Sequence, residues 1–315
     1  MSIADEIVRV TGVGETSGRL VAHLKALRPK QWIKNLLVFL PLLFAINEAW
    51  SPSNLTPLPD LLLSIVVVIL AFCSVSSGVY LLNDLMDREA DRRHPIKRNR
   101  PIASGKVTAP TAVTLMGVLG LGGLAVMYLV HPVLGGIGLI YVFTNIAYSL
   151  GAKQLVLLDV IMVASGYVLR AGAGAVAVGV DPSPWLYVVT GAAALFIVLG
   201  RRYAEVRLAE KEGVQQRSVL RNYAGPFISQ LISISATTAL VSYTLYAVEA
   251  DNLPDNHTML LTVPFVAFGL FRYLYLLNTN PEAEAPEQLI SRDVPLLAAT
   301  LCWIMVSTLV LFLNS

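Results

Sequence analysis

The apolar residues of this chain fall into long continuous runs, and this pattern limits the fold more than any other feature of the sequence. An α-helix needs about 20 mostly apolar residues to cross roughly 30 Å of hydrocarbon. Hydrophobic residues make up 55% of the chain and charged residues only 14%, which is too apolar for a soluble domain of this length. The sequence therefore predicts an all-α polytopic membrane protein with a single transmembrane domain over residues 19–315. Nine transmembrane helices are expected, near 32–50, 60–82, 110–130, 133–150, 155–179, 184–200, 226–249, 257–277 and 294–313.

The N-terminal segment is mostly polar until the first apolar run begins near Trp32, and no small-residue cleavage site follows that run. This pattern does not predict a signal peptide. Residues 1–18 are expected to form a disordered tail, and Arg19 to Pro29 a short amphipathic helix on the membrane surface. Cys73 and Cys302 both lie within apolar runs, where they are expected to pack and not to form a disulfide or bind a metal.

The 23 Lys and Arg residues are segregated between alternate connections of the nine runs. One set of connections carries nearly all of them, whereas the other set, at 47–59, 131–132, 180–183 and 250–256, contains none. By the positive-inside rule, the N-terminus is expected in the cytoplasm and the C-terminus outside the cell membrane. The basic residues lie in short loops and form no continuous stripe, so nucleic acid is not an expected partner.

The segment 83–105, NDLMDREADRRHPIKRNRPIASG, follows the second apolar run directly and is dense in charge. Asn83, Asp87 and Asp91 are spaced four residues apart, so on a helix they share one face, and Asp84 lies beside them. Neighbouring carboxylates repel one another unless a cation lies between them, and hard oxygen donors favour Mg²⁺ over zinc. The basic residues that follow could hold phosphate oxygens. The alternative interpretation is a solvated loop whose bases obey the positive-inside rule and whose acids balance them.

A second charged segment, RRYAEVRLAEKEGVQQRSVLRNY, covers Arg201 to Tyr223 on the same predicted side. Arg201 and Glu205 are four residues apart, as are Arg207 and Lys211, so one helical face can present alternating charges. A solvated helix stabilised by its own ion pairs is the simpler interpretation. Two such segments on one side, each directly after a span, favour instead two lids over one cavity.

A few polar residues lie at or within the apolar runs. Tyr148 and Lys153 end the fourth run, where interface anchoring and phosphate contact are equally reasonable roles. Asp159 and Arg170 lie inside the fifth run, where ionisable groups mark functional sites. They are roughly 16 Å apart along a helix axis, so each needs its own partner or ligand. Lys34, in RPKQWIKN, reaches into the first run and is the best candidate in that stretch for a role beyond anchoring.

These features resemble the UbiA superfamily of intramembrane prenyltransferases over nearly the whole chain: nine predicted spans, an N-D-x-x-D-x-x-x-D motif after the second, and a charged segment after the sixth. Within it, RPKQWIKN, the 83–105 segment and RRYAE look like the branch of decaprenyl-phosphate phosphoribosyltransferases. The resemblance implies a UbiA-like bundle with its active-site cavity on the cytoplasmic side. It also implies a pentosyltransferase that moves 5-phosphoribose from phosphoribosyl pyrophosphate to decaprenyl or another polyprenyl phosphate, for cell-wall arabinan (arabinogalactan) synthesis.

The resemblance assigns roles residue by residue. Asp84, Asp87 and Asp91 are expected to be catalytic, with Asn83, Asp87 and Asp91 as ligands of the Mg²⁺ cofactor. The residues expected to bind substrate are Lys34, Asn83, Arg92, Lys97, Arg98, Arg100, Tyr148, Lys153, Asp159, Arg170, Arg201, Arg202, Tyr203, Glu205 and Lys211. Membrane lipid and a second copy of the chain are further expected partners. A lipid phosphate is already anionic at neutral pH, so no catalytic histidine is expected.

The sequence departs from ordinary members of the superfamily in two places. They usually carry a second Asp-rich motif after the sixth span, where this chain has Arg201, Arg202 and Tyr203. More bases and fewer acids suit a donor with an additional 5-phosphate and an acceptor that is itself a phosphate. Tyr148 and Lys153 are five residues apart where four is common. The rival interpretations are an aromatic or quinone polyprenyltransferase, which the missing motif disfavours, and a transporter, whose charges would lie nearer the bilayer midplane.

Overall fold

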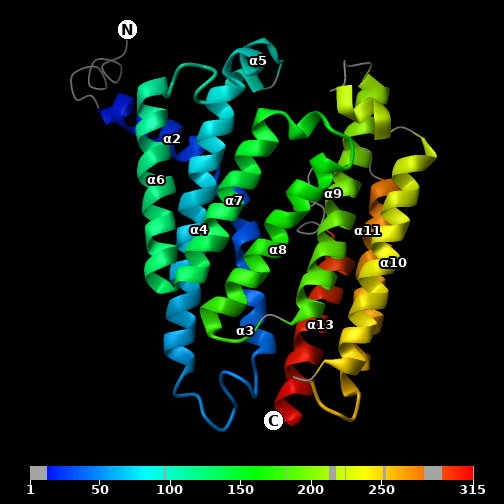
Figure 1. Cartoon of the computed structure of the whole chain (residues 1–315). Coiled ribbons are helices and arrows are strands. Elements are labelled where there is room, and N and C mark those ends of the chain that lie inside the picture. Colours follow the sequence, from blue (N-terminus) through cyan, green and yellow to red (C-terminus); the bar gives the residue numbers. More distant parts are fainter. Residues whose placement is uncertain are drawn as a thin grey trace. The chain divides into compact units, whose positions relative to one another are not determined.

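The computed structural model describes residues 13–95, 97–181, 183–212, 218–223, 225–250, 253–279 and 293–314. Within these ranges the chain is helical apart from turns and two isolated β-bridges, Ile46 with Trp50 and Ser51 with Asn54. Figure 1 traces the helices in chain order. The chain divides into two compact units: Met1–Leu36 with Val66–Ser149, and Leu37–Ile65 with Leu150–Ser315.

Among the described residues, eight helices are long and apolar enough to cross a membrane. They confirm eight of the nine predicted spans and the all-α membrane architecture. Their outer faces expose large apolar side chains such as Leu63, Leu121 and Leu129, as lipid-facing surfaces do. The helices are α4 (Leu58–Met86), α6 (Ala109–Val130), α7 (Pro132–Leu150), α8 (Leu158–Val178), α9 (Pro184–Glu212), α10 (Pro226–Glu249), η5 (Thr258–Thr262) continued by α11 (Val263–Thr279), and α13 (Val294–Leu313).

The predicted span at 32–50 is not one long α-helix. It consists of a 3₁₀ helix, η1 (Pro29–Phe39), a short α-helix, α3 (Leu40–Phe44), and a turn. Pro41 explains the break, because proline lacks the N–H that an interior α-helical position must donate and is tolerated only in the first turn. The turn closes where the Trp50 indole donates to the Leu42 carbonyl at 3.0 Å.

The first unit holds the charged segment 83–105 on a small apolar core. It contains α2 (Val13–Ala26), α4 from Val66, α5 (Arg88–Arg93), the 3₁₀ turn η2 (Lys97–Asn99), α6 and α7. Helix α2 includes residues 13–18 of the predicted tail, and residues 1–12 lie outside the described part of the chain. Leu81 of α4, Ala26 of α2 and Ile102 are buried in one cluster. The end of the charged segment is therefore fixed against the end of α4.

The second unit is centred on α9, which packs along both α8 and α10. Phe196 of α9, Tyr273 of α11 and Ile228 of α10 lie in its core, together with Tyr223 from the 3₁₀ helix η4 (Ser218–Tyr223). Helix α9 continues to Glu212, well beyond the predicted boundary at residue 200, so the first half of the second charged segment is a helical extension. Residues 213–217 of that segment lie outside the described part of the chain, and the two lids stay a prediction.

Helix α8 approaches the start of the second unit so closely that a side chain would not fit. A Cβ added at Gly174 would collide with the carbonyl of Val38 and lie 2.9 Å from the ring carbons of Pro41. Glycine at this position lets α3 pack directly on the α8 backbone.

Candidate active site

The predicted motif lies where α4 ends and α5 begins. Asn83 and Asp84 belong to the last turn of α4, Asp87 separates the two helices, and Asp91 lies in α5. The Asp87 amide donates to the Asn83 carbonyl at 2.9 Å, and the Asp91 amide to the Asp87 carbonyl at 2.8 Å. These bonds continue the four-residue helical spacing through the break, so the backbone has the arrangement that the sequence predicts.

Two carboxylates of the motif are buried and share one arginine. Asp84 is 3% exposed and Asp91 is 4% exposed. Nη1 of Arg100 donates to Oδ2 of Asp91 at 2.6 Å and to Oδ1 of Asp84 at 3.1 Å. Arg28 also forms an ion pair with Oδ1 of Asp84, and its guanidinium lies over the Tyr80 ring, 5.1 Å from the centroid. The structure thus brings together Asp84, Asp91 and Arg100 from the predicted set, and adds Arg28.

Arg28 is a site residue that the sequence reasoning treated as an interface anchor. Its backbone is in the left-handed region, with φ of 54°, directly before Pro29. A residue other than glycine or asparagine rarely adopts this conformation without a structural reason. The segment is held against α4, since Trp32 donates to the Ser77 hydroxyl at 3.1 Å and that hydroxyl donates to the Leu27 carbonyl at 3.1 Å. The only sequence signal was an arginine directly preceding a proline.

The Asn83 side chain is oriented by α7. The hydroxyl of Ser149, which is buried, donates to Oδ1 of Asn83 and also approaches the Asn145 carbonyl at 2.8 Å. The amide oxygen of Asn83 is therefore fixed in one direction, toward α7. Ser149 adjoins Tyr148, which is half-buried on the same helix.

The basic residues after the motif differ in their surroundings. Nε of Arg92 donates to the Ala103 carbonyl at 3.2 Å, which ties α5 to the end of the segment. Lys97 is half-buried and Arg98 is exposed. Nε of Arg88 is buried and has no hydrogen-bond partner among the described residues. The segment thus combines guanidinium groups used for structure with cationic groups at the surface.

The donor set fits a magnesium ion that is shared with a ligand. The carboxylates of Asp84 and Asp91 and the amide oxygen of Asn83 are all hard oxygen donors. In the described ranges, no three His, Cys, Asp or Glu side chains meet in a group that could hold a metal ion alone. Mg²⁺ in phosphate-handling sites takes one or two carboxylates and completes its shell with water and phosphate oxygens. This site matches that pattern and not a closed protein cage.

In the second unit, Asp159 forms the centre of a buried network. It has no exposed surface, and its Oδ2 accepts from Nε of Arg202 at 3.0 Å. The Tyr223 hydroxyl donates to Oδ1 of Asp159 at 2.5 Å and accepts from the Leu157 amide at 2.7 Å. Burial raises the pKa of the Tyr223 phenol, and the hydrogen bond to Asp159 raises it further. Sequence reasoning did not single out Tyr223, whose contact with Asp159 spans 64 positions.

The other predicted residues of α9 extend this network or face a neighbouring helix. Glu205 accepts from Arg202 at 2.7 Å and pairs with Arg201 at 3.4 Å. The Tyr203 hydroxyl donates to the Asn278 side chain at 3.2 Å. Lys211 belongs to the last turn of α9, and its side chain lies outside the described part of the structure.

The remaining predicted residues are distributed over both units. Arg170 is buried, and its Nη1 donates to the Gly166 carbonyl of its own helix at 2.6 Å. As predicted, Asp159 and Arg170 each have a partner of their own. Lys34 is half-buried in η1 of the first unit, and Lys153 is half-buried in the 3₁₀ turn η3 (Ala152–Gln154) of the second.

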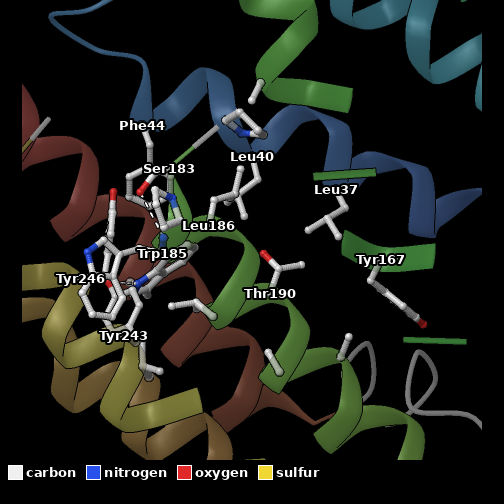
Figure 2. Close-up of a pocket in the computed structure, with 18 of the residues that line it drawn as sticks. Leu37, Leu40, Phe44, Tyr167, Ser183, Trp185, Leu186, Thr190, Tyr243 and Tyr246 are labelled. Carbon is white, nitrogen blue, oxygen red and sulfur yellow. Dashed lines mark hydrogen bonds between the residues drawn. The ribbon is translucent and has the colours of Figure 1, made fainter. Parts of the chain in front are cut away.

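An apolar cavity of about 670 Å³ lies inside the second unit. In Figure 2, Trp185, Tyr243 and Tyr246 gather at one end, with Leu37 and Tyr167 at the other. The described lining includes two acidic residues, Glu48 and Asp181, and no Lys or Arg. A cavity of this size and composition suits an uncharged apolar ligand and offers no cation for a phosphate.

Comparison with known proteins agrees with this architecture. The UbiA prenyltransferase family profile matches residues 38–292. Two relatives named decaprenyl-phosphate phosphoribosyltransferase are similar in sequence. The Mycobacterium tuberculosis protein is 35% identical over 93% of this chain and 95% of its own length, and the Mycolicibacterium smegmatis protein is 34% identical over 89% of each. The structure of a UbiA homolog from Archaeoglobus fulgidus bound to GPP and Mg²⁺ superimposes with a TM-score of 0.69 at 17% identity, covering 92% of this chain and 99% of that one. The chain therefore belongs to the UbiA prenyltransferase family and is a multi-pass membrane transferase.

Proposed function

We propose that this chain transfers 5-phosphoribose from phosphoribosyl pyrophosphate to a polyprenyl phosphate, such as decaprenyl phosphate, and releases diphosphate. The observation that carries the proposal is 35% identity to a relative named decaprenyl-phosphate phosphoribosyltransferase, sustained over 93% of this chain. The basic character of the second charged segment, Arg201 to Tyr223, supports the same donor, because that donor brings an additional 5-phosphate. The product would be a precursor of cell-wall arabinan.

The proposed donor site is the junction of α4 and α5. Asn83, Asp87 and Asp91, with Asp84 beside them, would hold Mg²⁺ on the diphosphate, which fits the oxygen donors found there. The ion would supply positive charge that stabilises the departing diphosphate. Cationic groups would hold the 5-phosphate and the lipid phosphate; the candidates are Lys97, Arg98 and Arg100 in the first unit and, separately, Arg201 in the second.

The proposed reaction forms one bond and breaks one bond at C1 of the ribose. An anionic oxygen of the lipid phosphate attacks C1, and the bond from C1 to the diphosphate oxygen breaks, with the electron pair leaving on the diphosphate. C1 gains oxocarbenium character as that bond weakens, and guanidinium groups fixed around the diphosphate stabilise the developing negative charge. No proton has to be removed from the acceptor, so the chain needs no general base.

The isoprenoid tail of the acceptor is proposed to occupy the apolar cavity of the second unit. Helix α9 lines the cavity from Trp185 to Ile197, a distance of roughly 18 Å at the usual helical rise. Arg201 lies one helical turn beyond Ile197, so a lipid whose phosphate contacts Arg201 could extend its tail directly into the cavity. The lining includes Glu48 and Asp181 and contains no described cation, which favours the uncharged tail over the phosphate.

The proposed topology keeps nine crossings, with the N-terminus and the active site in the cytoplasm and the C-terminus outside. The eleven residues of η1, at about 2.0 Å each, and the five of α3, at about 1.5 Å each, reach roughly 30 Å together. That length equals the hydrocarbon thickness, so the segment can cross although it is not one α-helix. The segregation of Lys and Arg then sets the orientation.

The test uses purified protein in detergent with Mg²⁺ and a polyprenyl phosphate. One reaction contains phosphoribosyl pyrophosphate labelled in the ribose, and a parallel reaction contains labelled polyprenyl diphosphate with 4-hydroxybenzoate. Label should enter the lipid phase from the sugar donor and should stop doing so when EDTA is added. Prenylation of the aromatic acid, with no label from the sugar donor, would instead assign the chain to the aromatic prenyltransferases.

A further inference from the structure

We infer that Arg28 and Arg100 couple metal binding to diphosphate binding at the junction of α4 and α5. This inference rests on the proposed function only in taking a diphosphate as the ligand. The two arginines neutralise the motif carboxylates while no phosphate is bound. A phosphate ligand draws the guanidinium groups toward itself and so opens the carboxylates to a divalent cation.

Exposure indicates which groups an arriving ligand meets first. The side chains of Arg28 and Arg100 each remain 29% exposed, whereas those of Asp84 and Asp91 are 3% and 6% exposed. The guanidinium groups therefore cover the carboxylates on the solvent side. A phosphate coming from solvent contacts arginine before any cation can contact both aspartates.

The charges of this four-residue cluster explain the coupling. Asp84 and Asp91 carry two negative charges, and Arg28 and Arg100 carry two positive charges, so the cluster is neutral as it stands. A divalent cation alone would have to displace the guanidinium groups or remain beside them, and both alternatives are unfavourable in a partly buried site. An anion with several charged oxygens makes both unnecessary, since some of its oxygens accept hydrogen bonds from the arginines and others coordinate the metal together with the carboxylates.

The two arginines can move to different extents. Arg100 follows the short η2 turn and bridges both carboxylates through one nitrogen, Nη1. Arg28 is held by its left-handed backbone, by Pro29 and by its contact with Tyr80. We therefore expect Arg100 to transfer fully to the ligand, and the Arg28 side chain to turn from Asp84 toward the ligand on a fixed backbone. Each guanidinium then lowers metal affinity only while no phosphate is bound.

The test measures binding of Mn²⁺ by electron paramagnetic resonance, with inorganic pyrophosphate as the probe anion and no lipid or sugar donor. In Arg28→Gln, affinity for Mn²⁺ alone should rise about fivefold or more, and the gain in affinity that pyrophosphate produces should shrink by a similar factor. Formation of Mn²⁺–pyrophosphate in solution is the same for every variant, so differences between variants report on the protein. Lys30→Gln, an exposed cation two positions away, is the matched control and should behave as wild type.

Two further variants decide the outcome. Arg28→Lys keeps the positive charge and should retain most of the coupling. Arg28→Gln combined with Asp84→Asn should lose the higher Mn²⁺ affinity expected of Arg28→Gln alone, because the carboxylate that binds the metal is gone. Thermal unfolding of each variant verifies folding. Unchanged or weaker Mn²⁺ binding in folded Arg28→Gln would overturn the inference. The transfer reaction is not measured here, so this result and the test of the proposed function can fail independently.

Discussion

The two charged segments are similar in composition, but their ion pairs differ in how much of each side chain is exposed. In the first, the Asp84 and Asp91 carboxylates are covered by arginines that remain 29% exposed. In the second, Arg202 and Tyr223 are buried and bind the buried Asp159 of α8, and these contacts join α8, α9 and η4. A buried pair with both partners satisfied is suited to holding helices together, whereas a pair with an exposed cation can exchange that cation for a ligand. The first segment is therefore the better ligand site and the second the better scaffold.

The largest effect should come from breaking the buried network of the second segment. Asp159→Asn removes the fully buried carboxylate that pairs with Arg202 and leaves Arg202 only the partly exposed Glu205, which should cost roughly 3 kcal/mol of stability. Thermal unfolding in detergent measures this cost, and the fraction that remains folded should keep a normal KM for the sugar donor. Glu210→Gln, an exposed acid near the end of α9, the helix that carries Arg202, is the control. An unchanged unfolding midpoint together with a raised KM would show that Asp159 binds ligand. The buried network would then be a ligand site and not a scaffold.

The first segment should respond in activity and not in stability. Asp91→Asn should lower transfer about 100-fold or more at saturating Mg²⁺, because the metal and the arginine both lose a carboxylate partner. Initial rates of label transfer measure this loss. Glu89→Gln removes an exposed acid from the same short helix and should leave the rate unchanged. Near-normal turnover of Asp91→Asn would refute its assignment as a metal ligand.

A smaller effect is expected from the phenol that completes the scaffold. Tyr223→Phe removes the donor to Asp159 and the acceptor for the Leu157 amide, at a cost of about 2 kcal/mol. The pKa of Tyr223 is raised in the folded state. The stabilisation that its protonated phenol provides is therefore fully present below the unfolded pKa of about 10, and it is lost as the pH rises through the folded-state pKa. Unfolding midpoints of wild type and variant should differ at neutral pH and converge in strong alkali. A difference that persists at every pH would contradict this assignment.

The smallest effect concerns an ion pair outside both segments. Arg272 of α11 donates to both oxygens of Asp293, at 3.1 and 2.8 Å, and these hydrogen bonds lower the pKa of the Asp293 carboxyl. Asn can still cap α13, so Asp293→Asn should cost less than about 1 kcal/mol. The stabilisation from this ion pair is present at pH values above the unfolded pKa of Asp293, about 3.9. It is lost as the pH falls through the lower pKa that Asp293 has in the folded state. A loss of stability as large as that of Asp159→Asn would show that burial does not decide how much an ion pair stabilises this protein.

Sequence pattern predicted most of the fold because the bilayer imposes it. Eight apolar runs became helices with boundaries close to those expected, since a chain in hydrocarbon must satisfy its backbone hydrogen bonds within each segment. The exceptions have local causes. Pro41, in the first turn of α3, prevents one α-helix from continuing through the first run. Helix α9 continues past its apolar part, where its charged extension contacts α11 through Tyr203. Hydrophobicity alone reports neither of these.

The candidate site was predictable only where its residues are neighbours in sequence. The spacing of Asn83, Asp87 and Asp91 was visible in the sequence, and the backbone retains it. The contacts of Arg28 with Asp84 and of Ser149 with Asn83 span 56 and 66 positions and depend on how helices pack, which one sequence does not reveal. The partners of Asp159, Arg202 and Tyr223, were likewise not predictable, since they lie 43 and 64 positions away; its role in substrate binding stays a prediction.

The most direct test of the central claim is to follow both halves of the sugar donor in one reaction. Phosphoribosyl pyrophosphate is labelled with ¹⁴C in the ribose and with ³²P in the diphosphate, and is incubated with Mg²⁺, a polyprenyl phosphate and the purified protein. Our account predicts that ¹⁴C enters the lipid phase while an equal amount of ³²P appears in the aqueous phase as free diphosphate. Entry of ³²P into the lipid, or retention of both labels in the aqueous phase, would contradict it.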